Sequence, residues 1–264
     1  MNIDQYRTAY NRSREYEFQK QNLNCVTGYW VSHWNTTGRP EIGLRPASDS
    51  EALDYDTPGG LNFMRAPAGQ RSVLLKTSNR RLSVGSIYLY DRLVHTQLYN
   101  ASGNQAHTIS TAPLPSRAGN GDGVELWIEF GTDTTTTDPL ATIEVEYTNS
   151  LGVSGRTTSA MNFPVRLRPH TALRMPLQAG DSGIRSIQKI TINSTWTTPT
   201  IAVVLAKRVT ALRNHVAGAS ITAGFLDIQD PKFTNDMCIY MVAGVSTTTS
   251  GAVNVTLTMA TVEE

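Results

Sequence analysis

The sequence predicts an all-β protein with a β-sandwich or jelly-roll-like core, preceded by an N-terminal helix and an extended arm. Two observations favour this fold class. Threonine, which is stiff at χ1 and suits a pleated surface better than a helix, occurs 33 times in 264 residues. From residue 71 onward, short runs of alternating apolar and polar residues recur between turn residues, and no long helical pattern alternates with them.

The first segment, residues 3–23, contains neither glycine nor proline. Tyr6, Tyr10 and Phe18 fall partly on one helical face and charged residues surround them, so we expect a helix over this segment. Such a helix either packs on the sheet of its own chain or docks on a neighbouring subunit. The docking alternative makes partner-binding candidates of Tyr6, Tyr10, Arg14 and Phe18.

Residues 24–70 are dense in glycine and proline, which predicts an extended, irregular chain. A short strand is expected over residues 26–34. Trp30 and Trp34 lie there and are further candidates for an interface or a glycan contact, with burial in the core as the alternative. We therefore divide the chain into an N-terminal helix and docking arm (residues 1–70) and a β-sandwich domain (residues 71–264).

Short strands fill the second part of the chain. Residues 141–148 show the clearest pattern, because Ile143, Val145 and Tyr147 alternate with threonine and glutamate, as in a sheet with one wet face. Residues 211–235 are expected to form a loop, and the last two strands a hairpin. The expected strands cover residues 72–77, 82–91, 124–130, 141–148, 155–163, 171–177, 184–196, 201–209, 237–245 and 252–262.

Composition excludes several classes of function. The formal net charge is +1, so the chain has no overall basic field for gripping nucleic acid. Its short basic groups (Arg80, Arg81, Arg166, Arg168 and Arg174) suit an acidic patch on a partner protein. Cys25 and Cys238 lack metal-ligand spacing and are expected to be buried thiols. Residues 1–20 lack the apolar stretch of a signal peptide, and no apolar run is long enough to span a bilayer.

Gly180-Asp181-Ser182-Gly183 matches the tetrapeptide around a chymotrypsin-type nucleophile. That chemistry requires a histidine within hydrogen-bond reach of the serine. The five histidines stand in no recognisable context, so we expect a turn between two strands. They are His33, His95, His107, His170 and His215.

Other apparent motifs also favour structure over catalysis. Residues 119–123 (GNGDG) precede a strand and hold one carboxylate, which indicates a tight turn instead of a phosphate or calcium loop. Glu144 and Glu146 are expected on a solvated sheet face instead of in a glycosidase pair. No histidine pair has metal-ligand spacing with a carboxylate. We expect no enzyme activity, no cofactor and no metal.

Four stretches resemble a group of tailed-bacteriophage virion structural proteins of the decoration (cement) or tail-associated kind. They are YNRSREYEFQ (residues 10–19), LYDRL (89–93), GRTT (155–158) and LQAGDSGI (177–184), and together they bracket most of the chain. The resemblance implies assembly on a phage particle, in the host cytoplasm, without catalysis. It supplies no catalytic residues.

This resemblance suggests a capsid decoration protein that binds the major capsid protein or other virion proteins and stabilises the shell. Copies sharing closed symmetry, as a trimer or dimer, would multiply the attachment points. Deleting residues 1–23 is then expected to abolish attachment while the sandwich still folds. The alternatives are a tail, baseplate or receptor-binding protein whose sheet holds a glycan, and a virion-associated hydrolase.

Overall fold

The computed structural model describes residues 3–21, 28–81, 85–133, 141–163, 167–194, 196, 199–214, 220–228, 232–245 and 252–263. Strands dominate these residues, which confirms the all-β prediction. The described helices are α1 (Ile3–Asn11) and the 3-10 helices η1 (Ser116–Ala118) and η2 (Phe225–Asp227). The strands are β1 (Arg14–Lys20), β2 (Trp30–Ser32), β3 (Gly38–Arg39), β4 (Ser50–Ala52), β5 (Gln70–Arg81), β6 (Gly85–Thr96), β7 (Tyr99–Asn100), β8 (Gln105–Thr108), β9 (Val124–Phe130), β10 (Thr142–Asn149), β11 (Arg156–Thr157), β12 (Met161–Asn162), β13 (Thr171–Met175), β14 (Ile184–Asn193), β15 (Thr200–Asn214), β16 (Ser220–Gly224), β17 (Lys232–Phe233), β18 (Ile239–Val245) and β19 (Val253–Glu263).

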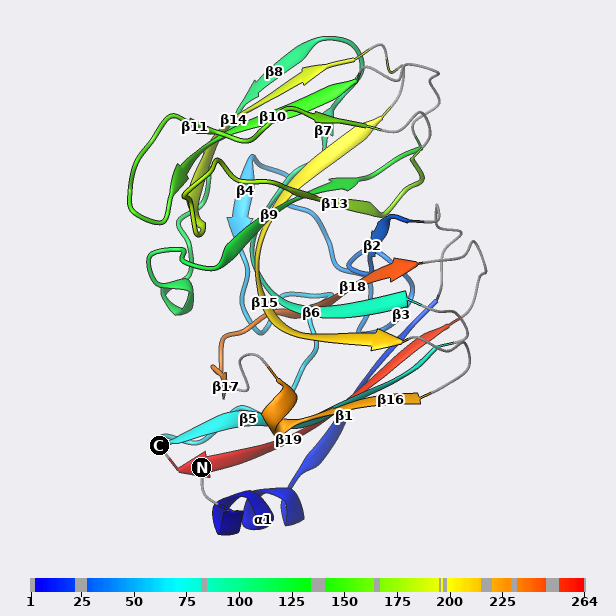
Figure 1. Cartoon of the computed structure of the whole chain (residues 1–264), viewed down its shortest axis with the longest axis vertical. Coiled ribbons are helices and arrows are strands. Elements are labelled where there is room, and N and C mark those ends of the chain that lie inside the picture. Colours follow the sequence, from blue (N-terminus) through cyan, green and yellow to red (C-terminus); the bar gives the residue numbers. More distant parts are fainter. Residues whose placement is uncertain are drawn as a thin grey trace.

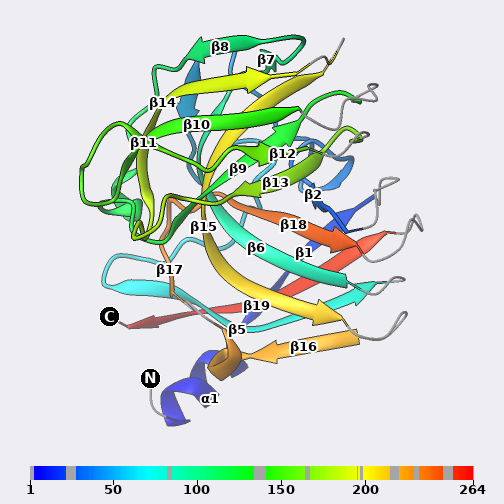
Figure 2. The ribbon, with the colours of Figure 1, turned by 45° about the horizontal axis from the view of Figure 1, so that its top comes forward.

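Three sheets are stacked along the long axis of the molecule (Figure 1). The middle sheet closes on itself, because β15 pairs with both β9 and β6, so that β6, β18, β2, β13, β9 and β15 form a barrel. The upper sheet has the order β11-β10-β14-β8, and the lower sheet has the order β16-β5-β19-β1-β3. In Figure 2, β15 bends from the side of the upper sheet to the side of the lower one.

The barrel packs outward on both flanking sheets, so its strands are buried on two faces. On the upper side, alternate residues of β9 and β15 such as Ile128 and Leu205 share a core with Val145 and Ile190 of the upper sheet. On the lower side, Leu89 and Met241 share a second core with Phe18, Val255 and Leu257 of the lower sheet. This arrangement is the sandwich-like part of the prediction, with a closed barrel as its middle layer.

The barrel interior holds aromatic and charged side chains. Trp34, Tyr90, Trp127 and Tyr240 are buried there with small residues such as Ala206. On the outer face of the lower sheet, α1 packs through Ala9 against Val73, Leu75 and Ala260.

The predicted helix over residues 3–23 is wrong beyond Asn11. Backbone bonds from Arg12 and Ser13 to the carbonyls of Ala9 and Tyr10 close the last turn. The chain then enters β1, which lies between β19 and β3. The reason is a period of two: Phe18 and Lys20 point inward while Glu15, Glu17 and Gln19 are exposed. Residues before and after the predicted domain boundary at residue 70 therefore share one sheet, since β1 pairs with β19.

The predicted C-terminal hairpin is also wrong. β18 joins the barrel beside β6 and β2, whereas β19 joins the lower sheet between β5 and β1. The segment expected to be a loop at residues 211–235 contains the end of β15, then β16, η2 and β17. The strand expected at residues 26–34 is described only as β2, and residues 26 and 27 lie outside the described residues, as do Cys25 and His215.

The irregular stretch from residue 33 to 69 packs against its own chain. Trp34 and Leu53 enter the barrel cluster, and Leu61 and Phe63 join the core between the barrel and the lower sheet. The chain is irregular here, as predicted, yet it is a strap across the barrel instead of a projecting arm.

Candidate functional site

A buried ion network crosses the barrel interior. The Arg92 guanidinium donates two hydrogen bonds to the Glu129 carboxylate, at 2.8 and 3.0 Å. Arg45 pairs with the same carboxylate, and Arg92 lies over the rings of Trp34 and Tyr240, at 4.5 and 4.8 Å from their centroids. Burial alone would raise the pKa of Glu129, but the two guanidiniums hold it well below its usual range. Both guanidiniums of the network therefore share one carboxylate inside the barrel.

His95 extends the network in one tautomer. Its Nδ1 lies 3.3 Å from Arg92 Nε, which can only donate, so Nδ1 accepts and Nε2 carries the hydrogen. Nε2 then donates to Glu51 at 2.6 Å. Burial and the neighbouring Arg92 and Arg45 hold the pKa of His95 far below its ordinary value of 6.5. His95 is therefore neutral in the folded protein.

This neutrality predicts a pH dependence of stability. Below pH 6.5 the unfolded chain binds a proton at His95 that the folded chain does not, so the free energy of unfolding falls with falling pH. The slope from this group approaches about 1.4 kcal/mol per pH unit. We expect His95→Gln, which can donate to Glu51 and accept from Arg92, to reduce this slope. Urea unfolding of both proteins at about pH 7 and about pH 5 measures it; equal slopes would contradict the assignment.

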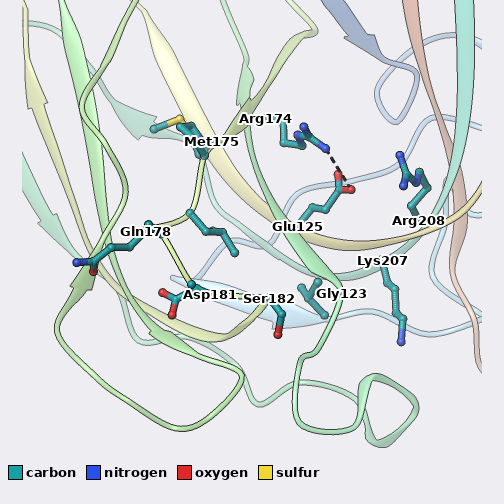
Figure 3. A pocket seen from close by; sticks show the side chains of 14 residues that line it. Gly123, Glu125, Arg174, Met175, Gln178, Asp181, Ser182, Lys207 and Arg208 are labelled. Carbon is teal, nitrogen blue, oxygen red and sulfur yellow. Dashed lines mark hydrogen bonds and ion pairs between the residues drawn. The ribbon is translucent and has the colours of Figure 1, made fainter.

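A cleft of about 500 Å³ opens where the start of β9, the end of β13 and the middle of β15 meet the loop after β13. Its side chains are drawn in Figure 3. Arg174 extends to Glu125, with 3.5 Å between Nη1 and Oε1, and Glu125 also accepts a 2.9 Å hydrogen bond from Tyr90. Lys207 and Arg208 enter from β15. The opposite wall is the loop of residues 176–182, which includes Gln178, Asp181 and Ser182.

Asp181 fixes this loop to the upper sheet. Its carboxylate accepts hydrogen bonds from Tyr147 (2.6 Å), Asn149 (2.7 Å) and both Nε and Nη2 of Arg156 (3.0 and 3.2 Å). The bonds from Arg156 lower the pKa of Asp181 to about 2. Two of the stretches that carry the sequence resemblance, residues 155–158 and 177–184, are thus joined by one ion pair.

Aromatic rings continue from the cleft into the barrel mouth. The guanidinium of Arg208 lies 5.8 Å from the centroid of Tyr88, and Tyr88 lies 4.6 Å from Trp30. Trp30 in turn makes an edge contact with Trp127 at 6.3 Å. Trp30 and Tyr88 are half-buried, so parts of both rings reach the surface. Lys207 and Arg208 were not singled out from the sequence, although two adjacent charges ending an apolar run were a readable signal.

Of the six candidate partner-binding residues, four remain accessible to some degree. Tyr10 and Arg14 are exposed, and Tyr6 and Trp30 are half-buried. The docking alternative is corrected for Phe18 and Trp34, because both are fully buried. Phe18 lies in the core between the barrel and the lower sheet, and Trp34 lies in the barrel. Phe18 is buried because it is on the inward face of a strand, and Trp34 because the strap folds back over the barrel.

The N-terminal part of the chain presents an apolar surface with η2. Tyr6 stacks with Tyr10 at 6.1 Å and meets Phe225 edge-on at 6.2 Å. Leu226, next in the chain, is 94% exposed, and Tyr10 is 45% exposed. We call this set (Tyr6, Tyr10, Phe225 and Leu226) the α1–η2 face. The sequence did not indicate its second half, because residues 225–227 fell in a predicted loop.

The apparent catalytic motifs have structural partners. Ser182 Oγ donates to Asp122 at 2.5 Å and lies 3.2 Å from Ser150 Oγ, neither of which is a histidine. Gly119, Gly121 and Gly123 have positive φ, as a tight turn requires, and Asp122 bridges to Gly183. Glu144 and Glu146 alternate with buried apolar residues on β10, as predicted.

Among the described residues, no group of three or more histidine, cysteine, aspartate or glutamate side chains is arranged to hold a metal ion. No helix in the described part of the chain is long and apolar enough to cross a membrane.

Comparison with known proteins gives weak similarities only. No family model matches the sequence, and no curated protein matches it. A chain in the structure of infectious bursal disease virus Gx strain is similar over 96% of this chain and 82% of its own length, with 10% identity and a TM-score of 0.23. A chain of the cyanophage Pam1 capsid asymmetric unit aligns with 55% of this chain and 92% of its own, with 15% identity and a TM-score of 0.21. Bacteriophage CBA120 tailspike protein 4 aligns with 54% of this chain and 20% of its own, with 11% identity and a TM-score of 0.23. All three are viral proteins, but TM-scores this low do not establish a shared fold and carry no weight for function.

Proposed function

We propose that this chain is a structural component of a tailed-phage virion, a capsid decoration protein that binds and stabilises the major capsid shell. The observation that carries the proposal is the α1–η2 face. A side chain as exposed as Leu226 beside three aromatic rings is unfavourable in water and suits burial against a partner. The stretches that resemble tailed-phage virion proteins support the choice of partner.

The α1–η2 face is built for a rigid contact. Ala9 anchors α1 to the outer face of the lower sheet, and Phe225 of η2 contacts Tyr6 of α1. The two halves of the face therefore support each other. Beside it runs a polar groove of about 650 Å³ between α1 and the ends of β5 and β19, lined by charged residues including Asp4, Arg12 and Arg71. An apolar centre with a polar rim is the usual composition of a specific interface. Trimers or dimers of the chain would raise avidity for a symmetric shell.

Deletion of residues 1–23 is not a clean test, because it removes β1 from between β19 and β3. Point changes are cleaner. We expect the double variant Tyr10→Ser/Leu226→Ser to bind purified expanded capsids at least about tenfold more weakly than the unchanged chain, because the centre of the interface is lost. Co-sedimentation over a range of protein concentrations measures this.

The matched control is Leu151→Ser. Leu151 is 79% exposed but follows β10, in the upper sheet away from α1. The control is expected to bind like the unchanged chain. Full binding by the double variant, or loss of binding in the control, would contradict attachment through the α1–η2 face. If the unchanged chain does not bind capsids but binds tails or baseplates, the proposed decoration role is wrong and a tail or baseplate role replaces it.

The second candidate is a tail, baseplate or receptor-binding protein. The observation that favours it is the cleft with half-buried Trp30 and Tyr88 beside it, because partly exposed aromatic rings next to polar groups suit glycan contact. Density mapping of the particle separates the two candidates by copy number and position.

A further inference from the structure

We infer that the groove beside α1 binds an extended segment of a partner protein that carries an acidic and a basic side chain about four residues apart. The inference rests on the proposed function and deepens it, because it names the chemistry of the shell segment that lies beside the α1–η2 face. The groove has a volume of about 650 Å³, within the usual range of ligand pockets. On one side it is lined by α1, and on the other by the start of β5 and the end of β19.

The sides of α1 have different contacts. Ala9 packs on the lower sheet and Tyr6 faces η2, whereas Asp4, Thr8 and Arg12 line the groove. Arg12 directly follows α1, and its amide still donates to the Ala9 carbonyl. Residues at intervals of four form a row along one side of a helix, so the groove offers a carboxylate, a hydroxyl and a guanidinium in series. Because α1 borders both the groove and the α1–η2 face, one partner can contact both.

Four charged side chains line the groove: Asp4, Arg12, Arg71 and Glu263. Among the ion pairs between described residues, none involves any of these four. α1 begins and β19 ends at the same edge of the lower sheet (Figure 1), so Asp4 and Glu263 lie toward one end of the groove and Arg12 toward the other. Two positive and two negative charges cancel, so the groove suits a segment with both signs of charge instead of a purely acidic or purely basic one.

Arg71 is the lining charge that has the least contact with water. It is half-buried, whereas Asp4, Arg12 and Glu263 are exposed. Its Nε is buried and has no hydrogen-bond partner. Exposed charges gain little from pairing because water already solvates them, and the attraction is stronger where less water intervenes. The contact between Arg71 and the acidic side chain of the segment is therefore expected to contribute most to binding.

The length of the row fits an extended chain. Asp4 and Arg12 are eight residues apart, which corresponds to about 12 Å along a helix. Four residues of extended chain span about 13 Å. Side chains four positions apart in such a chain point to the same side. A basic and an acidic side chain with this spacing can therefore reach both ends of the row together.

Isothermal titration calorimetry of the full chain with five short peptides tests the inference. Two peptides have mixed charge, acetyl-KTVTE-amide and its reverse, acetyl-ETVTK-amide, and the other three carry glutamine, glutamate or lysine at both ends. Threonine and valine favour the extended conformation. We expect one mixed peptide to bind at least about tenfold more tightly than the glutamine peptide, and added salt to weaken its binding. The mixed peptide that binds more tightly identifies the direction of the segment.

Variants of the groove supply the second arm. Arg71→Gln is expected to weaken binding of the mixed peptide by about tenfold, since a charge-assisted hydrogen bond is lost, with no change in the circular dichroism spectrum. Asp4→Asn should weaken it less, because Asp4 is exposed. The control is Arg7→Gln, which removes an exposed charge from the same helix outside the groove lining and should leave binding unchanged. In capsid co-sedimentation, Arg71→Gln should likewise bind more weakly than Arg7→Gln.

Three peptide results would overturn the inference: no binding of either mixed peptide at millimolar concentration, tighter binding of the glutamate or lysine peptide, or unchanged binding by Arg71→Gln. Capsid binding separates this inference from the proposed function. If Arg71→Gln binds capsids fully while Tyr10→Ser/Leu226→Ser does not, the inference fails and the proposed function stands. If the unchanged chain does not bind capsids, the proposed function fails, and the peptides still decide whether the groove takes such a segment.

Sedimentation velocity distinguishes a second copy of the chain from a different partner. A dimer that Asp4→Lys and Arg12→Glu each dissociate, and that the combined variant restores, would place the row of another copy in the groove and overturn the inference. The combined variant is instead expected to bind the mixed peptide no better than either single variant, because the peptide keeps its own charges.

Discussion

Replacing Glu129 by glutamine is expected to lower the free energy of unfolding by about 3–5 kcal/mol, the usual loss when one partner of a buried ion pair is removed. Glutamine keeps the shape of the side chain but leaves Arg92 and Arg45 as two uncompensated charges inside the barrel. Arg92 is fully buried, so water cannot replace the lost carboxylate. Urea unfolding followed by tryptophan fluorescence measures the loss, since Trp34 and Trp127 lie in the same interior.

The matched control is Glu125→Gln. Glu125 lies on the same strand and the same inward face, but at the barrel mouth, where its side chain is 18% exposed and its partner Arg174 is 57% exposed. Its loss is expected to cost about 1 kcal/mol or less. Losses of equal size at the two positions would show that burial of the network does not determine its energy.

A triple variant separates the cost of an unpaired charge from the effect of packing around the network. Replacing Arg45, Arg92 and Glu129 together by apolar residues of similar volume removes all three charges at once. Such exchanges are often neutral or stabilising by about 1–4 kcal/mol in other proteins. We expect the triple variant to be more stable than Glu129→Gln, because no unpaired charge remains. A triple variant as unstable as the single one would mean that packing around the network dominates.

The sequence predicted most strands but not how they are arranged. β10, a run with a period of two, lies within one residue of its expected bounds, because one wet face leaves a clear alternation. β14 begins at its expected residue, Ile184. The barrel left no such signal. Its closure depends on β6 pairing with β15, which lie more than a hundred residues apart, and its interior is polar enough to hold Arg92 and Glu129. Neither property can be read from local pattern.

The two strands of the wrongly predicted hairpin differ in burial. β18 is buried on both faces from Ile239 to Ala243, as expected of a strand inside a stack of layers, whereas β19 begins with an alternation of buried and exposed residues. Strands with such different burial belong to different sheets, even though a short segment connects them. The same reasoning recovers β1: the exposed Glu15, Glu17 and Gln19 mark a strand. The lack of glycine and proline and a partial helical face had suggested a helix there.

For the candidate site, the sequence singled out aromatic residues near the N-terminus. Tyr6, Tyr10 and Trp30 lie where a partner or ligand can reach them. It missed Phe225 and Leu226 because these residues are far from α1 in the sequence, and only folding brings them to it. It left docking and burial open for Phe18 and Trp34, because burial depends on which strand or barrel the chain returns to.

Trp34 gives the second large expected effect. Its ring is fully buried, its Nε1 donates to the Leu44 carbonyl at 3.0 Å, and Arg92 lies against its face. The strap is shaped around the ring: a Cβ added at Gly43 would lie 2.2 Å from Trp34 Cε2. Trp34→Ala is therefore expected to lower the free energy of unfolding by about 3–5 kcal/mol, through the cavity and the lost contacts.

The control for Trp34 is Leu44→Ala in the same strap, where a 67% exposed side chain is trimmed but the carbonyl that accepts from Trp34 remains. Its effect should stay within about 0.5 kcal/mol. Hydrogen exchange adds a local readout. The Gly43 amide donates to the Trp34 carbonyl at 2.8 Å, so its protection should fall more in Trp34→Ala than the protection of amides in β10. Equal stability of Trp34→Ala and Leu44→Ala would contradict this prediction, because the packing of Trp34 in the barrel would then contribute nothing to the free energy of unfolding.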